Sequence, residues 1–239
     1  MHEANLMKKK IAAGPAGLVM ALDFEGSSFA DSVVTTRGFG GGAATAVLSS
    51  AQFKNGANSY LQSQPSSGTA SYLNTPLSFD LTFAGDFWYE CWGYCLGQGN
   101  PTFTAGYNTI LSFGSYQANG GLCRWLLNNL KPCLSTPTGT VEAILVTAST
   151  ACTNNAWHHH ALGRKNNTLY MFLNGAVVAT ATLNGTFGFG ASMNIGGYAD
   201  SRIGNATYAG FNGYMDRWRV YNTCLFTSAF TPGTGLYPN

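Results

Sequence analysis

The chain has 239 residues, of which only 9% are charged and 45% are hydrophobic, and its formal net charge is +2. So little positive charge, with no basic cluster beyond the lysines at positions 8–10, does not suit a protein that holds nucleic acid along a groove. No apolar run approaches the ~18 residues that a membrane-spanning helix needs. We therefore expect neither nucleic acid nor a membrane among the partners, and a neutral, polar surface.

The N-terminal residues resemble a secretory leader, because three lysines precede an apolar run. Gly14-Pro15 interrupts that run, and residues 19–24 favour a first strand. We therefore expect no cleaved leader, an N-terminal arm over residues 1–17 and one folded domain over residues 18–239. The polar arm is expected to pack against a neighbouring subunit.

Short alternating runs between Gly, Asn, Ser and Pro predict an all-β sandwich or barrel, and the clearest run is DFWYECWGYC. On an extended strand the odd-numbered residues from Phe87 to Cys95 fall on one face and the even-numbered residues from Trp88 to Tyr94 on the other. Because aromatic residues occur on both faces, we expect this strand to be central in its sheet and covered on each side at least in part.

The six cysteines allow 15 complete pairings, among which the sequence does not choose. Cys91 and Cys95 are separated by roughly 13 Å along a strand, too far for a disulfide. Cys123 and Cys133 bracket a predicted hairpin, CRWLLNNLKPC, and could face each other across it. Our main interpretation is that the cysteines are small buried thiols, and no pair of CxxC motifs supports zinc.

Three of the four histidines are adjacent, in the segment Trp157-His158-His159-His160. On a strand His158 and His160 point one way, whereas Trp157 and His159 point the other. A zinc site needs three or four converging ligands, which this arrangement does not provide. We therefore interpret the histidines as structural and expect no metal site.

Downstream, Asn174-Gly175 lies between two apolar runs and suits the positive φ angles of a type I′ turn, which predicts a hairpin. Alternation and turn residues predict further strands at residues 108–114, 141–148, 193–197 and 213–221.

Four segments in order resemble motifs of the laminin G-like, concanavalin A-like jelly-roll domains. LDFEGSSFADS is similar to their opening strand, and DFWYECWGY to a strand written D-F-T-x-E-x-W. WHHHALGRKNNTLYMFLNGAVVA resembles W-x-H-V-A-x-x-R with a following hairpin, and YAGFNGYMDRWRVYNTCLFTSAFTP the closing F-x-G-x-x-D-x-x-R-x-Y segment with its F-T-P ending. The likeness runs from about Leu18 to Pro232 and implies a two-sheet antiparallel β-sandwich with an N-terminal arm.

The resemblance gives the motif residues structural roles. It implies that His159 serves packing and that Asp216 accepts hydrogen bonds from nearby backbone. Calcium is the alternative that laminin G-like relatives suggest, but Asp23, Asp31 and Asp200 are scattered singly, so no cofactor is expected. The residues with predicted structural roles are Trp92, Trp157, His159, Asn174, Gly175, Gly213 and Asp216.

The same jelly roll hosts glycoside hydrolases, whose retaining members need two carboxylates roughly 5 Å apart. The E-x-D-x-x-E pattern of laminarinase-type members does not occur in the sequence. Glu90, the best-placed acid, has no carboxylate at positions 88, 92 or 94 of the same face. No G-x-S-x-G elbow or phosphate-binding loop indicates another chemistry. We therefore expect no enzymatic activity.

The loop GGYADSRIGNATYAG gathers aromatic and polar residues of the kinds that stack on sugars and bind their hydroxyls. The alternative is that these residues line a subunit contact or a turn, because Tyr and Arg are also enriched in protein interfaces. The predicted glycan-binding residues are Tyr198, Asp200, Arg202, Asn205 and Tyr208.

The form of the domain with a terminal F-T-P resembles the type common in bacteriophage virion proteins, and sparse charge suits dense packing. We therefore predict a non-enzymatic virion structural protein, either a capsid decoration (cement) protein or a tail or fibre component. Its partners would be other virion proteins and further copies of itself, as in a trimer. The alternatives are a secreted or surface lectin module that binds a cell-surface glycan and, third, a glycoside hydrolase.

Overall fold

The computed structural model describes residues 16–25, 29–41, 46–62, 72–76, 78–97, 107–114, 122–138, 141–188, 192–197 and 210–233. In this part of the chain no helix is long and apolar enough to cross a membrane. The elements are β1 (Leu18–Leu22), β2 (Gly40–Gly41), β3 (Ala46–Ser49), β4 (Ser59–Gln62), β5 (Leu73–Pro76), the 3₁₀ helix η1 (Phe79–Leu81), β6 (Phe87–Cys95), β7 (Tyr107–Gly114), β8 (Leu122–Asn128), β9 (Lys131–Thr138), β10 (Val141–Thr147), β11 (Trp157–Lys165), β12 (Thr168–Leu173), β13 (Ala176–Thr182), β14 (Ser192–Ile195) and β15 (Gly213–Tyr221).

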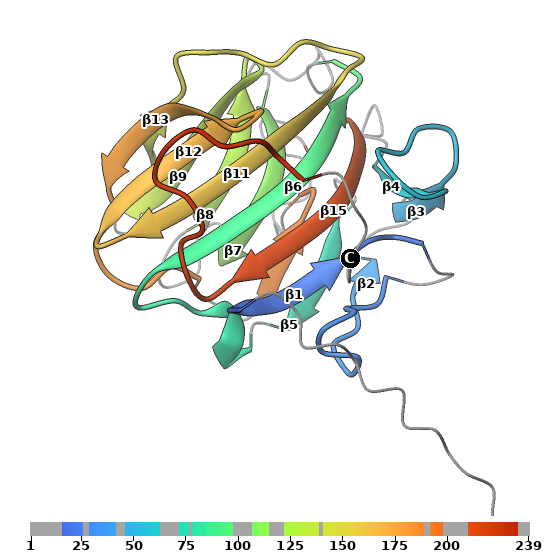
Figure 1. Cartoon of the computed structure of the whole chain (residues 1–239), viewed down its shortest axis with the longest axis horizontal. Helices are drawn as coiled ribbons and strands as arrows, with labels where there is room; N and C mark the ends of the chain where they lie inside the picture. Colours follow the sequence, from blue (N-terminus) through green and yellow to red (C-terminus); the bar gives the residue numbers. More distant parts are fainter. Residues whose placement is uncertain are drawn as a thin grey trace, which may run out of the picture.

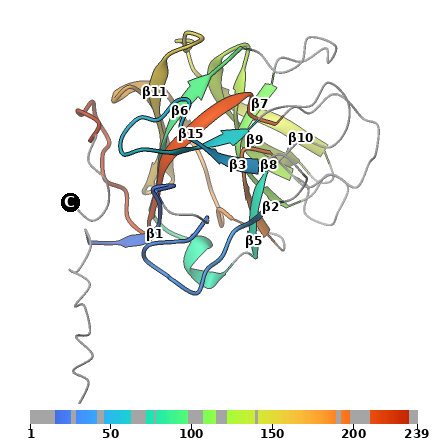
Figure 2. The same cartoon turned by 90° about the vertical axis from the view of Figure 1, so that its right-hand side faces the viewer.

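The strands form two antiparallel sheets that pack face to face (Figure 1). The eight-stranded sheet has the order β13-β12-β11-β6-β15-β4-β3, with β1 paired to β15. The seven-stranded sheet has the order β10-β9-β8-β7-β14-β5-β2. Figure 2 shows the two layers from the side, with β6, β11 and β15 in one and β7, β9 and β10 in the other. The predicted all-β sandwich is confirmed.

The strands β1, β7, β10, β14 and β15 lie where strands were predicted, and their ends differ by no more than two residues. β1 begins at Leu18. Residues 1–15 of the predicted N-terminal arm lie outside the described residues, so its contact with a neighbouring subunit stays a prediction.

The side chains of β6 alternate between two clusters, as predicted. Its inward residues lie in the core between the sheets, whereas Trp88 lies in a second cluster on the outer face. Residues 222–233, which we call the C-terminal strap, run across this face (Figure 1). The rings of Phe226 and Phe230 in the strap each lie 5.5 Å from the Trp88 ring, centroid to centroid. β6 is therefore central, covered on its inner face by the core and in part on its outer face by the strap.

The predicted hairpin at Asn174-Gly175 is confirmed by β12 and β13, with φ angles of 50° and 79° at the two turn residues. Gly175 also meets the strap, because the N–H of Phe230 donates to its carbonyl oxygen at 3.0 Å. A Cβ at Gly175 would lie 2.0 Å from the carbonyl oxygen of Phe230. This turn therefore needs glycine both for its φ angle and for the approach of the strap.

The predicted hairpin between Cys123 and Cys133 forms, but the expectation that the two thiols could face each other is wrong. Cys133 is paired with Leu126, three residues from Cys123 along β8. The register is set by a turn at Asn129 and Leu130, both with positive φ. All six cysteines are free thiols, and five of them are buried.

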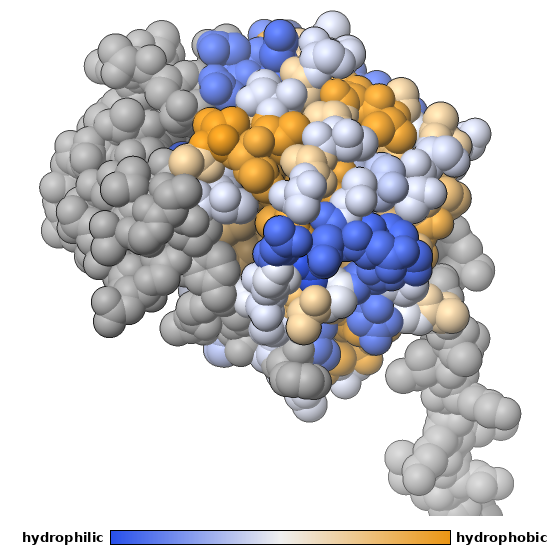
Figure 3. All heavy atoms as spheres, turned by 90° about the vertical axis from the view of Figure 1, so that its left-hand side faces the viewer, coloured by the Kyte–Doolittle hydropathy of each residue, from blue (hydrophilic) through white to orange (hydrophobic). Residues whose placement is uncertain are grey.

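The edge strands β10 and β13 expose apolar side chains. Ile144 and Leu145 of β10 are 44% and 36% exposed, and Val177 of β13 is 39% exposed. The two edges adjoin, because the N–H of Ser149 donates to the carbonyl oxygen of Val178 at 3.2 Å. Figure 3, which views the molecule from the side of β13, shows apolar patches among polar side chains.

Gly175→Ala is expected to lower the free energy of unfolding by about 1 kcal/mol through backbone strain and by a further 1–3 kcal/mol, roughly, through the clash with the strap. Gly185→Ala is the matched control, because Gly185 has a similar φ of 77° but no atom within 4 Å of an added Cβ. Urea denaturation of both variants measures the difference. Equal losses would contradict a close contact between strap and turn.

Candidate functional site

The loop predicted to bind glycans contains Tyr198, Asp200, Arg202, Asn205 and Tyr208, and all five lie outside the described residues. Their role stays a prediction, and the candidate site below is built from described residues only.

A row of aromatic and apolar side chains crosses the eight-stranded sheet. Trp157 of β11 lies opposite Tyr94 of β6, and Tyr94 lies opposite Tyr214 of β15. The row continues through Leu61 of β4 to Val47 of β3. Residues directly opposite on antiparallel strands share a face, so these five side chains point to the same side. We call them the aromatic row; its strands lie side by side in Figure 1.

The aromatic row lies on the outer face of the sheet. Its position follows from alternation, because Cys91 and Cys95 of β6 belong to the core and Tyr94 therefore points away from it. The ring centroid of Tyr94 lies 5.5 Å from that of Trp157 and 5.9 Å from that of Tyr214. Val47 is 46% exposed, and the other four side chains are half-buried. The row is therefore within reach of a ligand from solvent.

The next positions along the same strands, His159, Trp92 and Asp216, are covered. Trp92 is 8% exposed, and the Lys54 Nζ lies 4.0 Å from the centroid of its ring. The indole N–H of Trp92 donates to the carbonyl oxygen of Gly233, in the strap, at 3.3 Å. The strap and the β3–β4 loop, residues 50–58, thus cover this second row and border the aromatic row.

Asp216 anchors the β3–β4 loop. Its Oδ2 accepts the backbone N–H groups of Lys54 at 2.9 Å and Asn55 at 3.3 Å. Burial raises the pKa of Asp216 to about 7, although both N–H groups lower it. The resemblance implied hydrogen bonds from nearby backbone to this residue, and here they hold Lys54 over Trp92.

The three adjacent histidines lie in three environments. His158 and His160 share a face, with ring centroids 6.4 Å apart, and His159 points to the other face. The Nδ1 of His158 lies 3.0 Å from the Nδ2 of Asn174, whereas burial lowers the pKa of His160 to about 3. The alternation predicted for a strand is confirmed. Among the described residues no group of three or more His, Cys, Asp or Glu could hold a metal ion.

Two further motif residues have local structural contacts. The Oδ1 of Asn174 accepts the backbone N–H of His159 at 2.9 Å, which links the turn to β11. A Cβ at Gly213 would lie 2.0 Å from the carbonyl oxygen of Tyr94, so glycine permits the close approach of β15 and β6.

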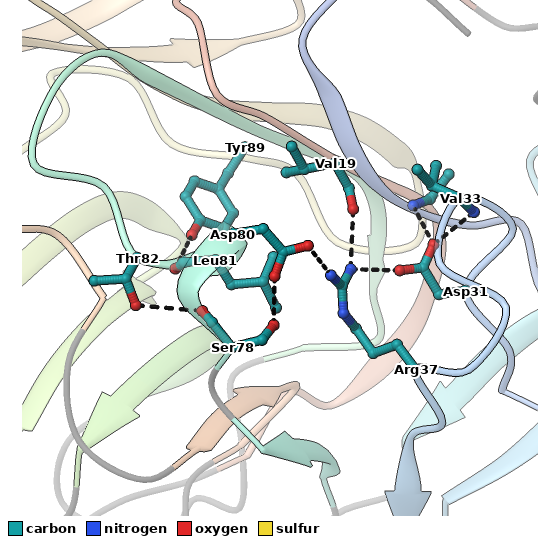
Figure 4. Close-up of polar contacts among 10 residues, drawn as sticks. Val19, Asp31, Val33, Arg37, Ser78, Asp80, Leu81, Thr82 and Tyr89 are labelled. Carbon is teal, nitrogen blue, oxygen red and sulfur yellow. Dashed lines mark hydrogen bonds and ion pairs between the residues drawn. The ribbon is translucent and has the colours of Figure 1, made fainter. Parts of the chain in front are cut away.

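Asp31, considered for calcium, lies in a buried ion-pair network (Figure 4). Its Oδ2 accepts the Nη1 of Arg37 at 2.5 Å, and its Oδ1 accepts the N–H of Ala21 at 3.1 Å. Arg37 also pairs with Asp80 through Nη2. The network ties the segment after β1 to η1. Asp23 lies elsewhere, 4.0 Å from Arg219, and Asp200 is outside the described residues.

Glu90 lies on the outer face between aromatic and imidazole rings. Its Oε2 accepts the indole N–H of Trp88 at 2.9 Å and lies 3.4 Å from the Nε2 of His159. Burial alone would raise the pKa of Glu90, but these partners and Arg219 hold it below its ordinary value. A general acid of a glycosidase needs a raised pKa, so this environment does not favour that role.

Sequence reasoning assigned Trp157 a structural role and did not combine it with Tyr94 and Tyr214. Each residue occupies an outward position of a motif strand. Alternation on each strand could therefore have shown that these side chains point outward. The sequence does not show which residues of different strands lie opposite one another.

A family model described as "Concanavalin A-like lectin/glucanases superfamily", of the laminin G type, matches residues 67–228. No curated protein matches the chain.

Three solved structures share the fold. Domain 4 of an extracellular arabinanase from Geobacillus stearothermophilus, in complex with arabinotriose, is 13% identical, with a TM-score of 0.65 over 88% of this chain and 95% of that one. A structure of botulinum neurotoxin type C, whose cell entry depends on interaction with two ganglioside molecules, is 9% identical, with a TM-score of 0.59. The match covers 88% of this chain and 49% of the toxin chain. The binding domain of botulinum neurotoxin DC, in complex with rat synaptotagmin II, is 8% identical, with a TM-score of 0.60 over 88% and 49%. The chain thus spans about half the length of the toxin chains.

Asp216→Asn is expected to change how stability depends on pH. The pKa of this carboxyl rises from 3.8 to about 7 on folding. Its contribution to the free energy of unfolding is therefore largest below pH 3.8 and is lost as the pH rises through 7. The amide of the variant does not titrate. The free energy of unfolding of the variant, minus that of the wild type, should therefore increase between about pH 5 and 7, by at most about 1.4 kcal/mol per pH unit.

Urea denaturation of both proteins across this range measures the difference. Groups such as His160 titrate in both proteins and cancel in the comparison. A difference that does not vary with pH would contradict the raised pKa of Asp216.

Proposed function

This chain belongs to the concanavalin A-like lectin/glucanase superfamily, and we propose that it is a non-enzymatic carbohydrate-binding domain. Its ligand would lie on the aromatic row of the eight-stranded sheet. A location outside the cell, on a virion or as a secreted protein, is part of the proposal.

The aromatic row is the observation that carries the proposal. Aromatic rings present an apolar face to the C–H groups of a sugar ring, and indole N–H and phenol O–H groups can bind sugar hydroxyls. Trp157, Tyr94 and Tyr214 supply both kinds of group from three adjacent strands, at ring spacings of 5.5 and 5.9 Å. Ligand sites commonly combine a largely apolar surface with a few polar groups that fix orientation.

The environment of Glu90 does not favour its use as the general acid of a glycosidase. Its carboxylate contacts Trp88 and His159, and its pKa lies below the ordinary value. Retaining glycosidases instead place two carboxylates about 5 Å apart and keep one of them protonated.

The solved neighbours guide the choice of ligands to test. The arabinanase domain was solved with arabinotriose, and the toxin structures concern gangliosides and synaptotagmin. Carbohydrate and protein partners are both represented, which is compatible with a glycan-binding domain that also adheres to protein.

Adhesion within a virion is a second candidate function. The exposed apolar residues Ile144, Leu145 and Val177 on the adjoining edges β10 and β13 favour it, because apolar patches on a surface often mark protein contacts. The resemblance to phage virion proteins motivates this specific role, with other virion proteins or further copies of the chain as partners.

Tyr94→Ala and Trp157→Ala are each expected to weaken binding to a soluble polysaccharide by at least about tenfold, the equivalent of 1.4 kcal/mol for one lost stacking ring. Affinity electrophoresis in gels that contain arabinan, xylan or mixed-linkage β-glucan measures the effect. The wild type should be retarded by at least one of them.

Tyr170→Ala is the matched control. Tyr170 is paired with Gly163, and Gly163 is paired with Trp88, so Tyr170 lies level with Trp88 in the sheet. Trp88 precedes Tyr94 by six residues on β6, which places Tyr170 roughly 20 Å from the aromatic row in the strand direction. This variant should bind like the wild type. Equal loss in all three variants, or a wild type that none of the gels retards, would contradict the proposal.

Leu145→Lys is expected to reduce self-association, if copies of the chain adhere through the β10 edge, because a desolvated charge disfavours an apolar contact. Sedimentation velocity over a range of protein concentrations measures this. A wild type that is monomeric throughout would argue against self-association through this edge.

A further inference from the structure

The aromatic row has a direction, since it runs across the strands and not along one of them. Its three rings come from β11, β6 and β15, which are neighbours in the sheet. Strands lie about 4.8 Å apart, so the five side chains from Trp157 to Val47 extend over roughly 19 Å. Such a length exceeds one sugar ring and suits several units of an extended chain.

The rings do not form a flat surface. The plane of Tyr94 is inclined by 61° to that of Trp157 and by 77° to that of Tyr214. A crystalline polysaccharide presents a flat face that needs coplanar rings. A single chain can instead turn from one unit to the next, so that each unit meets one ring.

The aromatic row carries no formal charge near neutral pH, because its members are Trp, Tyr, Leu and Val. Two charged groups that border the row are engaged with protein groups. The Lys54 ammonium lies over the Trp92 ring, and the Asp216 carboxyl is buried and accepts two backbone N–H groups. The surface therefore offers stacking and hydroxyl hydrogen bonds, which suit a neutral sugar.

We propose that the aromatic row binds a single neutral polysaccharide chain that lies across the strands and contacts the row with at least three consecutive sugar units. This inference rests on the proposed function and specifies its ligand. It differs from recognition of a terminal sugar, of an anionic polysaccharide or of a crystalline surface.

The test is isothermal titration of the wild type with linear oligosaccharides of one to six units, prepared from whichever of arabinan, xylan or mixed-linkage β-glucan binds best. Affinity is expected to rise by at least about tenfold from one unit to three, because each further unit reaches a further ring. Trp157→Ala and Tyr214→Ala, at opposite ends of the three rings, should each weaken binding of the trisaccharide.

Two further probes and one control complete the test. Microcrystalline cellulose should not remove the protein from solution, and polygalacturonate should bind more weakly than the neutral polymer. Tyr214→Phe retains the ring and should keep most of the affinity that Tyr214→Ala loses; thermal melts of both variants establish that they fold.

The outcomes separate the two proposals. If no polysaccharide binds the wild type, the proposed function itself is wrong. If a polymer binds through the aromatic row but a single sugar binds as tightly as the trisaccharide, only the inference of a multi-unit chain is overturned. Tighter binding to cellulose or to polygalacturonate would likewise overturn it and leave carbohydrate binding intact.

Discussion

The antiparallel pairing of β6 with β11 on one side and β15 on the other is the constraint on which the rest of this structure depends. Alternation along β6 sends Tyr89 and Cys91 into the core and Trp92 and Tyr94 to the outer face. Pairing then converts outward positions on separate strands into rows across the sheet. The covered row and the accessible aromatic row both result from this pairing.

The C-terminal strap packs on the outer face of the sheet and helps to cover the row of His159, Trp92 and Asp216. Its phenylalanines pack on Trp88, its Phe230 approaches Gly175, and its Gly233 accepts the indole N–H of Trp92. Apolar surface on this side of the sheet is thereby removed from water, as it is in the core. The rings of the aromatic row, in contrast, remain only half-buried. A ligand can therefore still cover them.

Several of the described charged residues hold segments of the chain together. Arg37 links Asp31 and Asp80, and Asp216 holds the β3–β4 loop through two N–H groups. Arg164 donates to the carbonyl oxygens of Phe83 and Gly85. Buried charges need such partners, because desolvation without them is costly. The aromatic row itself consists of uncharged residues, in agreement with an uncharged ligand.

The sequence by itself determined the all-β class, the faces of β6, the separation of the three histidines and the turn at Asn174-Gly175, because alternation and turn chemistry are local properties of the chain. The two-sheet sandwich was implied by the resemblance to laminin G-like domains. It did not determine that Cys133 pairs with Leu126, since the turn at Asn129 and Leu130 sets that register. Only the tertiary structure brought Trp157, Tyr94 and Tyr214 into one row, because their alignment depends on how three strands distant in sequence are paired.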